Sequence, residues 1–96
     1  MMTNCRAINI TKKALAYALE HGGWRGEFEH QGRVCVLGAV RKVVPKTANR
    51  ADWSQWASKR LGVALIRAND ILAPRNTNPA AWTLRKILAG KKITAT

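Results

Sequence analysis

Two cysteines and two histidines are the residues of this sequence best suited to metal binding or nucleophilic chemistry. Cys5, His21, His30 and Cys35 would together supply the four ligands of a zinc site. Their spacing contains no close pair of the Cys-x2-Cys or His-x3-His kind, which structural zinc sites normally use. We therefore predict no metal site and no cofactor.

Cys35 could instead be a thiol nucleophile, with His30 as its base and Asn69 or Asp70 as an orienting group. A reactive cysteine needs exposure and a lowered thiol pKa. Cys35 lies within the apolar segment VCVLGA, where a buried cysteine behaves as a small hydrophobic residue, and His30 lies in a polar stretch. We predict that the protein is not an enzyme and that Asn69-Asp70 braces the turn before the last helix.

The charge of the chain is its strongest functional signal. Seventeen Lys and Arg residues face five Asp and Glu residues, a net charge of +12. Residues 1–29 hold four basic and three acidic side chains, whereas residues 30–96 hold thirteen and two, so the excess lies in the second part. Self-repulsion on this scale destabilises a compact fold, and attraction to phosphate is the commonest compensation. The sequence predicts a polyanionic partner, first of all DNA or another nucleic acid.

Length and hydropathy place limits on the architecture and location. Ninety-six residues suit one domain, 1–96, with a modest core. The sequence has no apolar run of about 18 residues and no charged-then-apolar leader, so we expect no membrane span and a cytoplasmic location. Two cysteines without a secretion signal also argue against a disulfide.

Apolar spacing and capping signals predict an all-α fold, a compact bundle of about five short helices. Thr11 is a good N-cap and Gly22-Gly23 a good stop, Asn78-Pro79 begins the last helix, and Gly90 ends it. Residues 34–44 also suit a buried strand, but the stripe of Val36, Leu37, Val40, Val43 and Val44 favours a helix. The expected helices are 12–21, 34–44, 52–61, 63–72 and 79–89, with a loop at 24–33 that contains a short extended piece.

The segment 55–88 resembles the helix-turn-helix domains of lambda-repressor type. It has Ala57 four residues before Leu61, then Gly62-Val63, a second short helix, a basic loop and a Pro-started helix. The resemblance implies that residues 63–72 lie in the major groove, with Arg67 and Asn69 at base edges. The phosphate contacts would come from Lys59, Arg60, Arg75, Arg85 and Lys86, and Arg41 and Lys42 complete the predicted nucleic-acid-binding set.

A second resemblance spans residues 12 to 90. HGGWRGEF, GRVCVLGA and LGVALIRANDI, followed by a Thr and a closing helix, are similar to a family of small actinobacterial and actinophage proteins without an established activity. Residue 68 departs from that family, with Ala in place of the usual Trp. The resemblance implies a helical fold and a bacterial or phage origin. It leaves open an accessory protein that binds a host or defence protein, or one that captures a nucleotide signal in an arginine cluster. Whether the protein forms a dimer also stays open.

Overall fold

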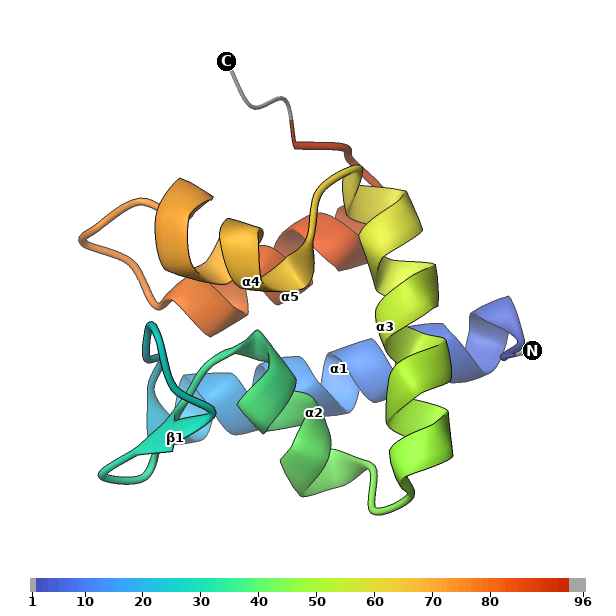
Figure 1. Ribbon diagram of the computed structural model, residues 1–96, viewed down its shortest axis with the longest axis horizontal. Coiled ribbons are helices and arrows are strands. Elements are labelled where there is room, and N and C mark those ends of the chain that lie inside the picture. Colours follow the sequence, from blue (N-terminus) through green and yellow to red (C-terminus); the bar gives the residue numbers. More distant parts are fainter. Residues whose placement is uncertain (1, 94–96) are drawn as a thin grey trace.

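Five α-helices, one π-helical turn and one short hairpin form the fold of residues 2–93, which are the residues that this computed structural model describes (Figure 1). The predicted all-α class and the number of helices are confirmed, while residues 1 and 94–96 of the predicted domain lie outside the described part. The elements are α1 (Asn4–His21), β1 (Glu29–His30), β2 (Arg33–Val34), α2 (Val36–Val43), α3 (Thr47–Leu61), α4 (Leu65–Arg67), η1 (Ala68–Leu72) and α5 (Pro79–Ala89).

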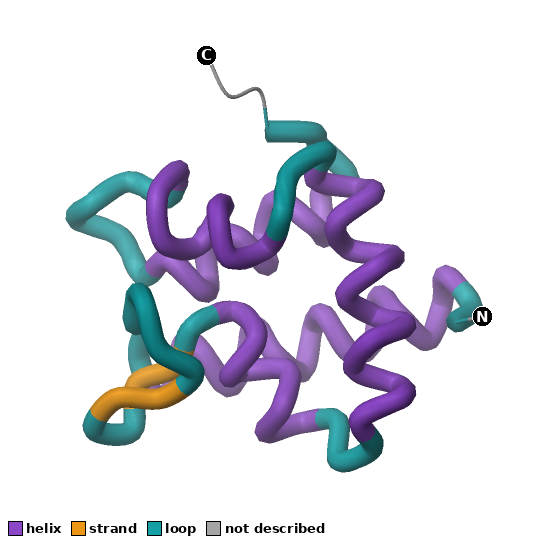
Figure 2. Tube along the Cα trace, viewed as in Figure 1, coloured by secondary structure: helices purple, strands orange, loops and turns teal. Residues whose placement is uncertain are grey.

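The helices form two layers. The principal extents are 34 × 32 × 18 Å, so the thin dimension holds two helix diameters. Helices α1 and α5 form one layer and pack against each other, while α2, α3 and α4 cover them from the other side (Figures 1 and 2). The antiparallel hairpin lies at one edge of this arrangement, beside the C-terminal end of α1.

Helix α1 is longer than predicted, and Thr11 is not its N-cap. The side chain of Thr3 caps the helix by accepting the N–H of Arg6, so α1 begins at Asn4. Ala7 and Ile10 continue the buried stripe toward the N-terminus, which explains the extra turns. Thr11 is fully buried in mid-helix, where its hydroxyl donates to Ala7 O at 2.7 Å and accepts the indole N–H of Trp53 at 3.0 Å.

The segment predicted as one helix over 34–44 divides at Cys35. Arg33 and Val34 pair with the preceding strand, which is the short extended piece expected within 24–33, and the helix begins at Val36. The thiol sulfur of Cys35 caps α2 by accepting the N–H of Gly38 at 3.3 Å. Gly38 is required here, because a Cβ at this position would overlap the carbonyl oxygen of Phe28.

Helix α3 also begins earlier than predicted, at Thr47, and ends as expected at Gly62 in the left-handed conformation. The predicted helix over 63–72 starts at Leu65 and changes at Ala68 into the π-helical turn η1, closed by the bond from Ala73 N to Ala68 O. The last helix agrees with the prediction. Asn78 caps it, Pro79 opens it and Gly90 ends it.

The core lies between the two helix layers. Trp53, Leu61, Leu84 and Ile87 are its largest fully buried apolar side chains. The other three tryptophans, predicted mostly as core anchors, are only partly buried: Trp24, Trp56 and Trp82. Within residues 2–93 no helix has the length and apolar character needed to span a bilayer.

Candidate nucleic-acid interface

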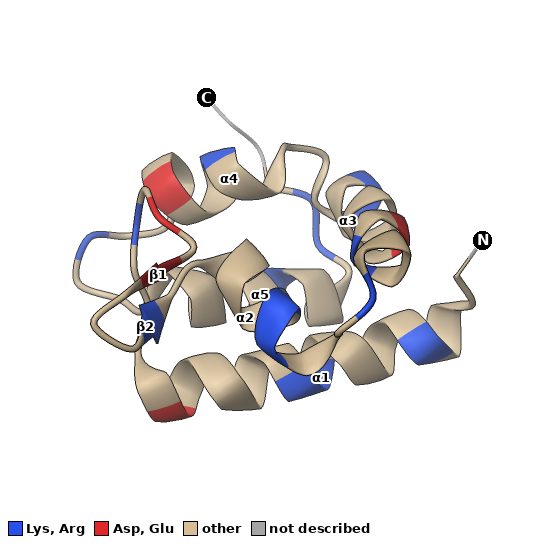
Figure 3. Cartoon of the chain, turned by 60° about the horizontal axis from the view of Figure 1, so that its bottom comes forward, with Lys and Arg blue, Asp and Glu red and all other residues tan. Residues whose placement is uncertain are grey.

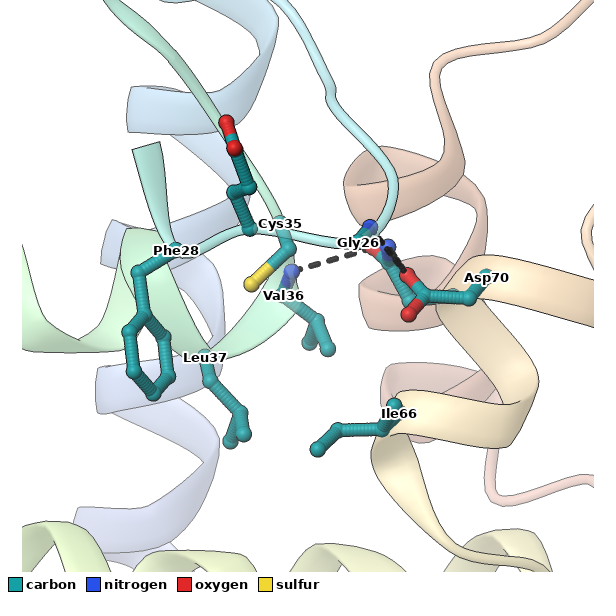
Figure 4. A pocket seen from close by; sticks show the side chains of 9 residues that line it. Gly26, Phe28, Cys35, Val36, Leu37, Ile66 and Asp70 are labelled. Atoms are coloured by element: carbon teal, nitrogen blue, oxygen red, sulfur yellow. Dashed lines mark hydrogen bonds between the residues drawn. The ribbon is translucent and has the colours of Figure 1, made fainter. Parts of the chain in front are cut away.

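Asn69, in η1, joins this turn to the loop after α1 and to the start of α2, at the hairpin side of the molecule. Its amide oxygen accepts the N–H of Val36 at 3.0 Å, and its amide nitrogen donates to Asp70 Oδ1 at 2.7 Å (Figure 4). The amide nitrogen also donates to the carbonyl of Trp24 at 2.9 Å. The side chain is fully buried. The prediction that Asn69 reads a base edge is therefore wrong, because every polar atom of its side chain is bound to the protein itself.

Four further hydrogen bonds fix the loop after α1 onto η1 and the residues that follow it. Asp70 Oδ1 accepts the N–H of Gly26 at 3.0 Å. The guanidinium of Arg25 donates to the carbonyl oxygens of Asn69, Ala73 and Pro74 at 2.8 to 2.9 Å, at the C-terminal end of η1. The side chains of Asn69 and Asp70 thus brace the loop 24–28 and the start of α2. The turn after η1, which we expected them to brace, is held by Arg25 instead.

Cys35 faces a small hollow, of about 140 Å³, between the hairpin and η1 (Figure 4). Phe28, Leu37 and Ile66 form most of its apolar wall, and Asn69 and Asp70 lie at its polar side. Burial raises the pKa of the Cys35 thiol, despite the opposing hydrogen bond from Gly38. Because a thiol with a raised pKa remains protonated at neutral pH, Cys35 has the properties of a helix cap and a core residue.

His30, the residue considered as a base for Cys35, contacts Trp24 and Glu27. Its ring stacks on Trp24 with centroids 4.0 Å apart and planes within 5°, and its Nδ1 lies 3.0 Å from Glu27 Oε2. Across residues 2–93, no three His, Cys, Asp or Glu side chains gather in a way that could hold a metal ion.

The acidic residues are concentrated on one side of the molecule (Figure 3). The basic residues occur on all five α-helices and on β2, but not in the π-helical turn η1. Glu20, Glu27, Glu29 and Asp70 lie around the hairpin, and only Asp52 lies elsewhere, on α3. Among the described residues, a single Lys or Arg forms an ion pair with a carboxylate: Lys42 Nζ lies 2.8 Å from Glu29 Oε2. The other sixteen Lys and Arg residues have no carboxylate partner in the described part of the chain. Of these, Arg25, Arg50 and Arg60 donate to backbone carbonyls.

The C-terminal ends of α3 and α5 meet, and four cations lie on the two chain segments that form this junction. Two hydrogen bonds join the end of α3 to α5 and the segment after it: Ile93 N donates to Leu61 O at 2.8 Å, and Arg60 Nε donates to Ile87 O at 3.0 Å. The stem of Lys92 lies against Gly62, with Cδ 3.5 Å from the position of a Cβ there. We call this group the α3–α5 cluster; it consists of Lys59, Arg60, Lys91 and Lys92.

The α3–α5 cluster is also favourable for the fold itself. Cations stabilise the negative end of a helix dipole, and two helices end here. The guanidinium of Arg60 is held 4.9 Å from the ring centroid of Trp56, which fixes its position. Lys86 lies one turn back along α5, with its ammonium 5.5 Å from the Trp82 ring centroid. Of the predicted phosphate contacts, Lys59 and Arg60 belong to the last turn of α3, and Lys86 belongs to the last turn of α5.

The remaining predicted residues lie in other places. Arg41 and Lys42 are exposed at the end of α2, where Arg41 stacks on Phe28 at 4.6 Å and Lys42 pairs with Glu29. Arg67 is exposed on α4 next to Ile66, Arg75 is exposed in the turn after η1, and Arg85 is exposed on α5.

Sequence reasoning missed several basic residues of these two surfaces, namely Arg25, Arg33, Lys91 and Lys92. The pair Lys91-Lys92 directly after Gly90 was a usable signal, because cations that follow a helix stop lie near its C-terminus. Arg25 and Arg33 gave no such signal, since their positions depend on contacts with residues far along the chain.

Comparison of the chain with known protein families, with curated proteins and with solved structures finds no match in any of the three. The resemblances to lambda-repressor-type domains and to the actinophage family therefore stay predictions.

Proposed function

We propose that this protein binds a polyanion, with nucleic acid as the partner, through the α3–α5 cluster. The carrying observation is that sixteen of its seventeen Lys and Arg residues have no carboxylate partner within residues 2–93. Cations that are not neutralised internally repel one another, and phosphates remove that repulsion while releasing the counterions of the nucleic acid.

The α3–α5 cluster is the part of the surface best suited to this role. One acidic residue lies beside it: Asp52, two turns back along α3, lines the same hollow as Lys59. The other four acidic residues lie around or before the hairpin or in η1. Lys59, Lys91 and Lys92 are exposed, while Arg60 is held by Ile87 O and by Trp56. Phosphate contacts of this kind fix position on a nucleic acid without reading its sequence.

Contacts with base edges have less support. The helical unit α4–η1 exposes Ile66, Arg67 and Ile71, and only Arg67 of these carries a donor for a base. We therefore expect binding with little sequence preference and a strong dependence on salt.

The test is a fluorescence-anisotropy titration against duplex DNA, single-stranded DNA and RNA at increasing salt. On duplex DNA the log–log slope should change by about 0.9 for each phosphate neutralised. K91Q/K92Q should lower the slope by up to about 1.8, while K12Q/K13Q, which removes the same charge from an exposed lysine pair on α1, should leave it nearly unchanged. No binding to any of the three nucleic acids at 50 mM salt, or equal effects of the two double variants, would contradict the proposal.

A second candidate is binding of a host or defence protein, and one observation favours it. Ile66 and Ile71 are 57% and 67% exposed on the same helical unit, and Phe28 is 49% exposed across the adjoining hollow. Exposed apolar side chains in such a group are typical of protein interfaces. A partner retained from nuclease-treated lysate by the wild type and by L19E, but lost by I71E, would support this function. Identical retention by all three proteins would argue against it.

A further inference from the structure

Three arginines from three segments line one open hollow on the hairpin side of the molecule. Arg25 comes from the loop after α1, Arg33 from β2 and Arg75 from the turn between η1 and α5. The hollow has a volume of about 310 Å³, and none of the described residues that line it is acidic. We infer that it binds the phosphate group of a small organic phosphate. The remaining lining residues are Gly23, Trp24, Thr77 and Pro79.

Arg25 is held in place by the backbone. Its two terminal nitrogens donate to the carbonyls of Asn69, Ala73 and Pro74. An arginine has five N–H donors, so these three bonds leave two of them, including that of Nε, without a partner within residues 2–93. Arg25 therefore supplies a fixed positive charge to the lining of the hollow.

Arg33 is positioned by Gly22. A Cβ on Gly22 would lie 3.3 Å from Arg33 Cγ, and the φ angle of Gly22 is +92°, so both the space and the backbone conformation favour glycine. The stem of Arg33 thus runs over the end of α1. Its guanidinium has no carboxylate within 4.0 Å among the described residues, and the residue is exposed.

Arg75 is carried by an ordered turn. The hydroxyl of Thr77 donates to Pro74 O at 2.7 Å, and the Thr77 N–H donates to the same oxygen at 3.2 Å. The turn is also tied to Arg25, which donates to Pro74 O at 2.9 Å. The backbone that carries Arg75 is therefore fixed relative to Arg25 before any ligand binds.

These features select a phosphate ligand. Guanidinium groups bind phosphate through paired N–H donors, and their planar geometry means that less freedom is lost for each hydrogen bond formed than with a lysine ammonium. Small-molecule pockets span about 300 to 1,000 Å³, so this one suits a phosphate or diphosphate with part of its organic group. Trp24, braced by its stack on His30, offers an apolar wall for that group.

The start of α5 does not supply the phosphate contacts. Pro79, the only residue of α5 that lines the hollow, has no N–H. Ala80 and Ala81 do not line it, and the N–H of Ala81 is already bonded to the side chain of Asn78 at 3.0 Å. Recognition therefore depends on the three guanidiniums. The hollow is also independent of the α3–α5 cluster, since the two share no residue.

The test is a calorimetric titration of the full chain with inorganic pyrophosphate, with the arginine Nε–Hε NMR signals followed in parallel. We expect saturable binding and shifts of the Arg33 and Arg75 signals. R33Q and R75Q should each weaken binding by about tenfold or more, the effect of one lost charge-assisted hydrogen bond. R85Q removes the same charge from an exposed site on α5 and should weaken it by less than about twofold.

Two results would overturn the inference: no saturable binding of pyrophosphate to the wild type, or an effect of R85Q as large as that of R33Q. Melting temperatures equal to that of the wild type would show that the variants are folded, and the NMR shifts keep the test decisive if one variant is not.

Two further titrations identify the source of the phosphate. Tighter binding of a nucleoside diphosphate than of pyrophosphate would indicate a free nucleotide. Tighter binding of a 5′-phosphorylated trinucleotide than of the same trinucleotide with a 5′-hydroxyl would indicate the end of a nucleic acid. The K91Q/K92Q variant should bind pyrophosphate as the wild type does, which separates this site from the α3–α5 cluster.

Discussion

The amide oxygen of Asn69 accepts the backbone N–H of Val36 at 3.0 Å, although 33 residues separate the two in sequence. This bond satisfies the first N–H of α2, a group that a helix leaves without an internal partner. The same amide holds the carbonyl of Trp24 through its nitrogen. The buried side chain of Asn69 thus provides hydrogen-bond partners for backbone groups of two other segments.

Replacing Asn69 should therefore destabilise the fold strongly. N69A leaves the Val36 N–H and the Trp24 carbonyl buried without partners, and we expect a loss of about 2–4 kcal/mol in the free energy of unfolding. N69D should be at least as harmful, since a carboxylate would face Asp70 Oδ1 and the Trp24 carbonyl. Urea unfolding measures both. N76A, at an exposed loop position, should change stability by less than about 0.5 kcal/mol, and an equal effect of N76A and N69A would contradict this role.

The fold could be predicted where its signals are local. Asn78, Pro79 and Gly90 specify the two ends of α5 within a few residues, and they appear in the structure as the sequence indicates. The start of α1 could not be found in the same way. Thr11 has the character of an N-cap, and only the contact with Trp53, 42 residues away, gives it a place inside a longer helix.

The candidate site could be predicted only in part. The excess of cations is a property of composition, but their grouping depends on where α3 and α5 end relative to each other. Asn69 was predicted at a base edge because the helical pattern of 63–72 does not reveal the change to π-helix at Ala68. That change, together with the partners Val36 and Trp24, accounts for its burial.

Thr11 provides a second test of a buried hydrogen bond. T11V keeps the shape of the side chain but leaves the indole N–H of Trp53 without an acceptor in the core. We expect a loss of about 1–3 kcal/mol in the free energy of unfolding. T83V is a matched control, because Thr83 is equally buried and its hydroxyl donates only to Pro79 O within the same helix. If T83V lowers the free energy of unfolding as much as T11V does, the hydrogen bond from Trp53 adds nothing to stability.

The two cysteines should differ in reactivity. Cys5 is exposed on α1, whereas Cys35 is buried and its thiol pKa is raised by burial. At about pH 8 a disulfide reagent should label one thiol rapidly in the native protein and both in denaturant, and C5S should abolish the rapid phase. Rapid labelling of native C5S would contradict the structure.

The raised pKa of Cys35 also predicts a dependence of stability on pH. The native state favours the neutral thiol, so the contribution of Cys35 is fully present below the ordinary pKa of 9.0 and is lost as pH rises through the native value above it. The free energy of unfolding should fall more steeply above pH 9.0 in the wild type than in C35A. Parallel curves for the two proteins would count against the shift.

The Glu29–Lys42 ion pair should be visible as two opposite pKa shifts. The ammonium of Lys42 lowers the pKa of Glu29 below 4.5, and Glu29 raises that of Lys42 above 10.5. The pair therefore supports the fold between these values and loses its effect as pH falls through the native pKa of Glu29 or rises through that of Lys42. In an NMR titration, K42M should raise the pKa of Glu29, while K46M should leave it unchanged. An unchanged Glu29 pKa in K42M would disprove the pair.

Gly38 marks the closest approach between α2 and the hairpin, and its replacement tests that contact. G38A should be strongly destabilising, because its Cβ would overlap the Phe28 carbonyl oxygen, which also accepts the N–H of Cys35 at 3.3 Å. G26A is a suitable comparison: Gly26 has a φ of +87° with nothing within 4 Å of its Cβ position. It should cost only the strain of a left-handed residue, about 1–2 kcal/mol. In G38A, steric overlap with the fixed backbone of Phe28 adds to any local cost. Thermal unfolding should therefore show a larger drop in melting temperature for G38A than for G26A. The reverse order would mean that α2 does not pack on the hairpin in this way.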